Sequence, residues 1–240
     1  MAHIILTGAT GSAGAAVLAH ALSSPAVSRI SILSRRPVKL AENQPKAKVI
    51  IHKDYEHYPQ EVLEQLKDAK GVIWAQGISS RGMSEADYTK ITHDYPVAAA
   101  KAFSAVNSQI NFVYMSGEGA DTQENSSMLF GRVKGRAENA LHALQKDHAS
   151  LNLYNIRPAM INPQGNYLSE RTPTMQDRGL TLLGGLCERV WKSAVIPTDK
   201  LANVCVDLAT GDGKPIPAVE GVEADGRLLR NTALRRLAGI

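Results

Sequence analysis

The 240-residue sequence has only two cysteines, few aromatic residues (5%) and no run of about 18 apolar residues. Cys187 and Cys205 match no metal-ligand spacing and cannot form a disulfide framework, so we expect no metal site and a reducing compartment. Without a long apolar run, no membrane-spanning helix is expected. A strand is predicted within three residues of Met1, which leaves no room for a secretory signal peptide, so the cytoplasm is the expected location.

The charge is nearly balanced, with a formal net charge of +4. No cluster of basic residues interleaved with aromatics accompanies this small excess, so we expect no nucleic-acid partner. Hydrophobic residues make up 44% and charged residues 21%, which is typical of a folded globular domain rather than a disordered chain. The length fits a single domain over residues 1–240, and nothing in the composition indicates its oligomeric state.

The first two thirds of the chain alternate between short apolar runs and amphipathic or alanine-rich stretches. This alternation predicts an α/β fold with a doubly wound parallel sheet of the Rossmann type. The predicted strands cover residues 3–7, 29–34, 48–52, 71–75, 110–115 and 151–157, and the predicted helices 13–22, 59–66, 85–106 and 129–146. After Pro158 the pattern is broken by prolines and glycines, with helices predicted at 180–191, 201–208 and 227–237. We therefore expect residues 161–240 to form a small irregular C-terminal cap on the substrate side of the sheet, where open α/β folds bind ligands.

A glycine-rich loop separates the first predicted strand from the first predicted helix. Gly8, Gly11 and Gly14 are spaced by two residues, as required for a tight turn, an approach of bare backbone to a pyrophosphate and close helix packing. The start of the following helix offers free N–H groups to phosphates. A purely structural turn is the alternative, but the position at the start of a βαβ series favours dinucleotide binding. The residues expected to contact the cofactor here are Gly8, Thr10, Gly11, Ser12, Ala13 and Gly14.

The end of the second predicted strand distinguishes NADP from NAD. NAD-binding domains place an acidic residue there for the ribose 2′-hydroxyl, whereas this chain has Arg35 and Arg36. A guanidinium suits a 2′-phosphate, so we predict NADP(H) as the cofactor, with a solvated basic loop as the alternative. Asp54 and Tyr55 follow the third strand and are candidates to contact the adenine, or simply form a turn. Three further candidates follow the fourth strand: Ala75, Gln76 and Gly77.

Together these features resemble the short-chain dehydrogenase/reductase superfamily, in particular its atypical branch and the group that includes TIP30 and the fungal FMP52 proteins. The stretches that carry the resemblance are residues 7–14, 34–37, 88–95, 115–121, 133–138 and 157–158. The resemblance implies that Lys134 hydrogen-bonds the nicotinamide ribose. We also expect Pro158, Ala159 and Met160, which follow the sixth strand, to contact the cofactor.

The chain departs from this superfamily at its proton-handling positions. A tyrosine four residues before the lysine normally protonates the substrate oxygen, with a serine after the fifth strand orienting the carbonyl. Here the tyrosine position is Phe130 and the serine position is Gly117, although a shift of one residue would let Ser116 serve. Glu118 is the best substitute acid, with a solvated loop carboxylate as the alternative, and Tyr114 is expected in the core. The candidate catalytic residues are therefore Lys134, Ser116 and Glu118.

Two functions remain open at this stage. The first is an NADP(H)-dependent enzyme acting on a small organic substrate, either an atypical reductase or a redox-neutral catalyst. The second is a non-catalytic NADP(H)-binding regulator or sensor that acts through a protein partner. The fold alone does not choose between them.

Overall fold

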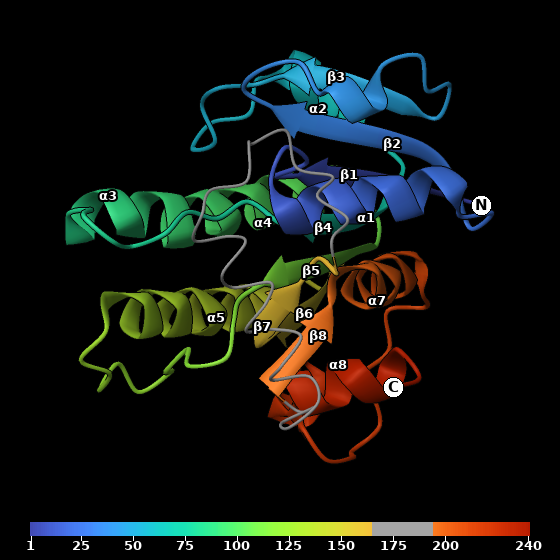
Figure 1. The fold of residues 1–240 in the computed structure, drawn as a ribbon. Helices are drawn as coiled ribbons and strands as arrows, with labels where there is room; N and C mark the ends of the chain where they lie inside the picture. The colour runs from blue at the N-terminus through green and yellow to red at the C-terminus, as the bar shows by residue number, and fades with distance from the viewer. Residues whose placement is uncertain (165–193) are drawn as a thin grey trace.

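The computed structural model describes residues 1–164 and 194–240, which form a parallel sheet covered by helices on both faces (Figure 1). The strands are β1 (Ala2–Thr7), β2 (Val27–Ser34), β3 (Ala47–Ile51), β4 (Ala69–Trp74), β5 (Ile110–Met115), β6 (Leu151–Arg157), β7 (Met160–Asn162), β8 (Val195–Pro197), β9 (Val222–Glu223) and β10 (Leu228–Arg230). The helices are α1 (Ser12–Ser23), α2 (Gln60–Leu66), α3 (Glu85–Thr89), α4 (Tyr95–Val106), α5 (Leu129–Asp147), α7 (Thr198–Thr210) and α8 (Asn231–Leu237). Short helical segments are η1 (Lys39–Ala41), η2 (Lys90–Asp94) and η4 (Ala224–Gly226).

The strand order confirms the predicted doubly wound fold. Within the described residues the main sheet has eight strands in the order β3-β2-β1-β4-β5-β6-β10-β9, parallel except for β9. Its first six strands follow the Rossmann order, in which successive strands are added on one side of β1 up to β3 and on the other side from β4 onwards. The glycine loop follows β1, and therefore lies at the crevice where such sheets bind nucleotides.

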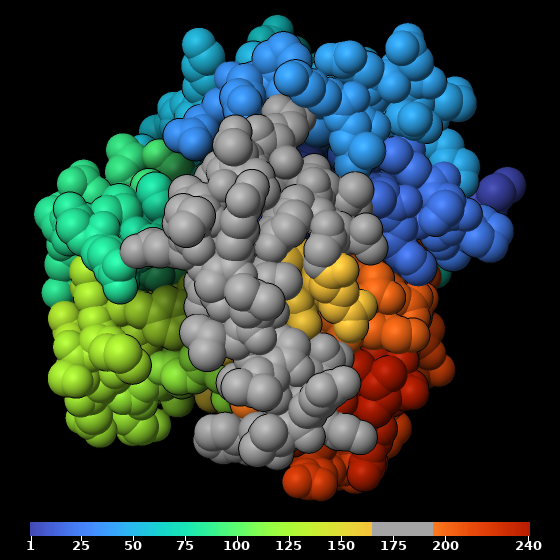
Figure 2. All heavy atoms as spheres, viewed as in Figure 1, coloured from blue at the N-terminus to red at the C-terminus, as the bar shows by residue number. Residues whose placement is uncertain are grey.

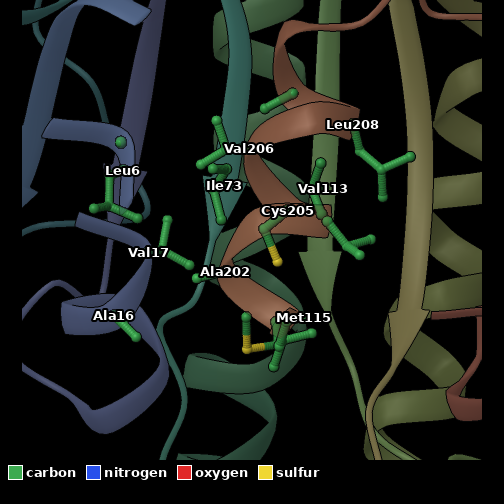
Figure 3. Packing of buried hydrophobic residues seen from close by; sticks show 14 of the residues in the cluster. Leu6, Ala16, Val17, Ile73, Val113, Met115, Ala202, Cys205, Val206 and Leu208 are labelled. Carbon is green, nitrogen blue, oxygen red and sulfur yellow. The ribbon is translucent and has the colours of Figure 1, made fainter. Parts of the chain in front are cut away.

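Helices cover the two faces of the sheet as separate layers. On one face α1, α7 and α8 pack over a core that includes Leu6, Val17, Val113 and Cys205 (Figure 3). On the other face α2, α4 and α5 pack over a second core, which contains the buried rings of Trp74, Phe103 and Phe112 among others. Strands buried on both sides explain why the β1 and β5 sequences are apolar runs rather than alternating patterns.

The C-terminal part differs from the predicted irregular cap. Helix α7 packs beside α1 on the sheet, and β10 extends the sheet by pairing in parallel with residues 155–157 of β6. The predicted helix at 227–237 begins only at Asn231, because three of its residues are strand β10. The predicted helix at 201–208 lies inside α7, whereas the one at 180–191 falls outside the described residues.

The predicted long helix at 85–106 is interrupted by a π-helical turn, η2. Pro96 has no N–H to donate to the carbonyl of Thr92, four residues earlier. The hydroxyl of Tyr114 donates to that carbonyl instead, at 2.9 Å. Tyr114 is therefore a buried structural residue, as predicted, and its hydroxyl is already in use.

The surface in Figure 2 shows the same arrangement of elements. Residues of β2 and β3, in blue, form the upper part of this face. Helices α3 to α5, in green, form its left side, and α7 and α8, in orange to red, form the lower right.

Among the described helices, none is long and apolar enough to cross a membrane.

Candidate functional site

A cavity of about 820 Å³ lies at the carboxyl ends of β1, β2 and β4. It brings together most of the residues predicted to bind the cofactor. These are Gly8, Thr10, Gly11, Ser12, Arg35, Arg36, Tyr55, Ala75, Gln76 and Gly77. No Asp or Glu is among the described lining residues, so the charge of this cavity comes from its two arginines. The cavity therefore suits an anionic ligand of nucleotide size.

The three glycines of the loop have different structural tasks. Gly8 has a φ of +73°, and a Cβ there would overlap the carbonyl of Ala75. A Cβ on Gly14 would overlap the carbonyl of Gly8, so this glycine lets α1 pack against the strand. At Gly11 a Cβ would lie 3.4 Å from the oxygen of Gly8, which is an ordinary contact. Gly8 and Gly14 are thus required by the fold, whereas Gly11 keeps the cavity open.

The N-terminus of α1 carries no cap of its own. Its N-cap residue is Gly11, no side chain caps it, and the first turn has no acidic residue. The unpaired N–H groups and the helix dipole therefore leave a partial positive charge at the cavity. A phosphate is the ligand that such a terminus binds most readily.

The end of β2 supplies the fixed positive charge of the cavity. Arg35 and Arg36 are both exposed, and the backbone N–H of Arg36 donates to the hydroxyl of Ser34 at 3.4 Å. Tyr55 also lines the cavity, and its hydroxyl donates to the carbonyl of Leu33 at 3.1 Å. Burial raises the pKa of Tyr55 to about 12. Tyr55 therefore supports the strand end as a neutral side chain.

Asp54 is not among the described residues that line the large cavity, and its contact with the cofactor stays a prediction. Its side chain is 60% exposed and accepts hydrogen bonds from the backbone N–H of Glu56 and from Nδ1 of His57. These local hydrogen bonds lower the pKa of Asp54. The alternative interpretation, a turn after the strand, is the one that the geometry favours.

The second group of predicted residues lies at the carboxyl end of β5. Nζ of Lys134, on α5, donates to the carbonyls of Met115 at 2.9 Å and Ser116 at 2.8 Å. The same nitrogen lies 5.5 Å from the ring centre of Phe130 and 5.8 Å from that of Tyr114. Burial lowers the pKa of Lys134 to about 8. The structure thus brings Lys134 to the carboxyl end of β5, with the ring of Phe130 beside its Nζ.

Ser116 and Glu118 follow β5 but point into different surroundings. The Ser116 hydroxyl is buried and has no hydrogen-bond partner among the described residues. Glu118 accepts from the guanidinium of Arg230 at 2.9 Å and from the backbone N–H of Asn231, also at 2.9 Å. It therefore caps α8 and lines a separate cavity of about 410 Å³. Its role as the substitute acid stays a prediction.

The remaining predicted residues lie outside the large cavity. Ala13 packs against the hydrophobic core, and Gly14 packs closely against the backbone of Gly8. The carbonyl of Pro158 accepts from the backbone N–H of Glu118. The backbone N–H of Ala159 donates to Oδ1 of Asn231 at 3.0 Å. Met160 begins β7 and pairs with Val195 of β8. Their contact with a cofactor stays a prediction.

Five further residues that line the cavity were not predicted from the sequence: Ala9, Leu33, Ser34, Ile78 and Ser79. Ala9 and Ser34 lie within stretches already singled out. Ile78 and Ser79 directly follow Ala75, Gln76 and Gly77, so a predicted loop two residues longer would have included them.

No family model matches the chain. Curated relatives do match. The chain is 32% identical to leucinostatins biosynthesis cluster protein T of Purpureocillium lilacinum, over 97% of this chain and 94% of that protein. It is 31% identical to the mitochondrial protein fmp52 of Emericella nidulans, over 68% of this chain and 69% of that protein. The chain belongs to the FMP52-like group of atypical short-chain dehydrogenases/reductases.

Solved structures share the fold of this FMP52-like chain at low identity. Vestitone reductase from alfalfa superimposes with a TM-score of 0.66 at 14% identity, covering 91% of this chain and 75% of that enzyme. The Bordetella bronchiseptica enzyme WbmF, solved in complex with NAD⁺, superimposes with a TM-score of 0.67 at 12% identity, covering 99% of this chain and 78% of WbmF. These likenesses confirm the Rossmann-type fold.

The comparison contradicts the cytoplasmic location expected from the sequence. The FMP52 relatives, from Emericella nidulans to Candida albicans, are named as mitochondrial proteins. The expectation was based on the lack of a secretory signal and on the few cysteines. Neither observation distinguishes the cytoplasm from a mitochondrion.

Proposed function

We propose that this protein binds NADP(H) and acts on a small organic substrate without the tyrosine-based carbonyl reduction typical of its superfamily. The observation that carries the proposal is the large cavity. It joins the uncapped start of α1 to Arg35 and Arg36, with no acidic side chain in the described lining. A dinucleotide with an extra phosphate on its adenosine ribose matches both positive regions.

The ends of the cofactor can be assigned by the superfamily's pattern. The pyrophosphate would lie against residues 10–12, and the 2′-phosphate beside Arg35 and Arg36. Lys134 is the residue that would hold the nicotinamide ribose. Bound NADPH supplies a hydride in related enzymes; in this chain the acid that would complete such a reduction is missing at Phe130.

The substrate class is proposed from the relatives. One is named for the leucinostatin biosynthesis cluster, and another, 34% identical over 59% of this chain, for the botcinic acid biosynthesis cluster. Both names refer to the biosynthesis of small organic molecules. They support a small-molecule substrate for this chain.

Calorimetric titration of the purified protein with NADP⁺ and with NAD⁺ tests the proposed cofactor. We expect NADP⁺ to bind at least about tenfold more tightly, because one charge-assisted contact is worth about 1.5–3 kcal/mol. Equal dissociation constants, or no binding of either nucleotide, would refute the assignment.

A non-catalytic NADP(H)-binding regulator that acts through a protein partner is the second candidate. The replacement of both proton-handling residues, at Gly117 and Phe130, favours it. A sensor of this kind would bind NADP(H) normally and show no turnover with any small substrate. Saturable turnover of any compound would exclude it.

A further inference from the structure

A buried ion pair joins helix α5 to the carboxyl end of strand β6. Glu138, on α5, is only 1% exposed, and the side chain of Arg157, the last residue of β6, is 11% exposed. Nε of Arg157 donates to Oε1 of Glu138 at 2.9 Å, and its Nη2 donates to Oε2 at 2.5 Å. One guanidinium therefore engages both carboxylate oxygens, in a two-point geometry that fixes orientation as well as distance.

Stability alone does not account for a pair of this kind. Taking two charges out of water costs about as much free energy as their attraction returns, and apolar side chains of similar volume are often equally stabilising or better. A bidentate pair does, however, specify one arrangement of the two elements that carry it. The pair of Glu138 and Arg157 therefore fixes how α5 lies against the end of β6.

The restraint lies close to Lys134. Lys134 precedes Glu138 by four residues on α5, a spacing that puts the two side chains on the same face of the helix. Arg157 directly precedes Pro158, where the chain leaves β6 at the edge of the sheet that binds ligands in open α/β folds. The loop after β5 meets the chain at this point, since the backbone N–H of Glu118 donates to the carbonyl of Pro158 at 3.0 Å. The ion pair thus connects the helix that carries the lysine with the ends of the strands beside it.

The amine of Lys134 depends on the position of α5. Its side chain is long and flexible, and its Nζ donates to the carbonyls of Met115 at 2.9 Å and Ser116 at 2.8 Å. Because these acceptors lie at the end of β5, the amine keeps its place only while α5 keeps its register with the sheet. On the other side of the lysine, a Cβ added to Gly135 would overlap the carbonyl of Asp121, so the helix also packs closely on the loop after β5. The helix is therefore fixed on both sides of the lysine.

We propose that the Glu138–Arg157 pair is a positioning pair, which holds the Lys134 amine where it binds the nicotinamide ribose of NADP(H). The pair acts in two ways. It fixes α5 against the end of β6, and it occupies a carboxylate that would otherwise pair with the lysine four residues before it. In this role neither residue needs to touch the cofactor. The inference rests on the proposed function, because it takes NADP(H) as the ligand and Lys134 as its ribose contact.

The binding of two nucleotides tests the proposal. The variant is Glu138→Leu with Arg157→Met, which removes both charges together and leaves no unpaired charge in the interior. NADP⁺ has the nicotinamide ribose that Lys134 would bind, whereas adenosine 2′,5′-bisphosphate lacks the nicotinamide half. We expect calorimetry to show about tenfold weaker binding of NADP⁺ and unchanged binding of the bisphosphate. Unchanged NADP⁺ binding overturns the proposal. An equal loss for both ligands also overturns it, because it would show general damage to the fold.

A Lys134→Met background distinguishes positioning from any other effect of the pair. If the pair acts through the lysine, adding the two substitutions to Lys134→Met should weaken NADP⁺ binding no further. Additive losses would contradict the proposal. Glu124→Gln with Arg136→Met is the matched control, because it removes a more exposed ion pair of α5, in which Nη2 of Arg136 lies 2.7 Å from the Glu124 carboxylate. This control should leave both dissociation constants unchanged, and a tenfold loss of NADP⁺ binding in it would count against a specific role of the buried pair.

The wild type separates this inference from the proposed function. If the wild type binds NADP⁺ and the variant binds it equally well, the positioning pair alone is refuted. If the wild type binds neither nucleotide, the cofactor assignment is refuted, and the role of the pair with it.

Discussion

Gly117 faces the ring of Phe130: a Cβ added to Gly117 would lie 3.0 Å from Cζ of that ring. The motif spacing predicts that these are the positions of the superfamily's serine and tyrosine. The glycine leaves space that the phenyl ring fills, so the two departures from the pattern belong to one packing arrangement. The ring brings no hydroxyl to the position where the motif predicts a catalytic phenol.

This contact predicts that Gly117→Ala destabilises the protein. The added methyl group meets the ring at a distance that requires the ring to shift, and overpacking of this kind costs about 1–3 kcal/mol. The same substitution in a Phe130→Leu background should cost less, because leucine has no Cζ. Urea unfolding of the four proteins in this double-mutant cycle measures the difference. An identical cost in both backgrounds would show that the two residues are not coupled.

The arginines predict the response of cofactor preference to charge reversal. Arg35→Asp should weaken NADP⁺ binding by about 10–150-fold, since it removes a charge-assisted contact and adds repulsion of the phosphate. NAD⁺ affinity should change much less. Arg236→Asp, on an exposed position of α8, is the matched control and should leave both dissociation constants unchanged. An equal effect of the two substitutions would mean that Arg35 does not contact the cofactor.

Two glycines of the loop should respond in opposite ways to substitution. Gly11→Leu should fold normally, because its Cβ finds an ordinary contact, yet lose NADP⁺ binding because the side chain fills the cavity. Gly14→Ala should instead lower stability by about 1–3 kcal/mol, because its Cβ overlaps the carbonyl of Gly8. Thermal unfolding with and without NADP⁺ measures both properties. A ligand-induced shift that survives in Gly11→Leu would place the cofactor elsewhere.

The pKa of Lys134 predicts a pH-dependent stability. The folded protein binds a proton at Lys134 less tightly than the unfolded chain does, because the pKa falls from 10.5 to about 8 on folding. Stability from this residue is therefore lowest below pH 8 and rises as the pH increases from about 8 to 10.5. Relative to Lys134→Met, the wild type should gain about 1–2 kcal/mol between pH 7 and pH 9.5. A difference between the two proteins that is independent of pH would contradict the lowered pKa.

The sequence predicted the N-terminal part of the fold and most of the cavity because local signals specify them. Strands such as β1 and β5 are apolar runs that end at glycine or at the start of a loop, and the glycine spacing marks the first turn. Tyr55 and Arg35 were found by their position after strands. The lysine and the missing tyrosine were found through a motif that spans only a few residues.

The features that escaped prediction depend on contacts between distant residues. Strand β10 has three residues, too few for a periodic pattern, and it forms by pairing with β6 some 70 residues earlier in the chain, as Leu228 with Asn155. Glu118 looked like a free loop carboxylate because its partner, Arg230, is 112 residues away. Likewise, the use of Glu138 by Arg157 cannot be read from their separate positions in the sequence.

The proposed function is that this protein binds NADPH but does not use it for ordinary carbonyl reduction. A single-turnover experiment tests it most directly: protein saturated with NADPH is mixed with a panel of small aldehydes and ketones, and NADPH absorbance is followed. We expect the wild type to consume NADPH no faster than the protein-free mixture, and Phe130→Tyr, which adds the hydroxyl, to give a measurable increase. Rapid consumption by the wild type that persists in Ser116→Ala and Glu118→Gln would contradict the account, because it would require a proton donor outside the site described.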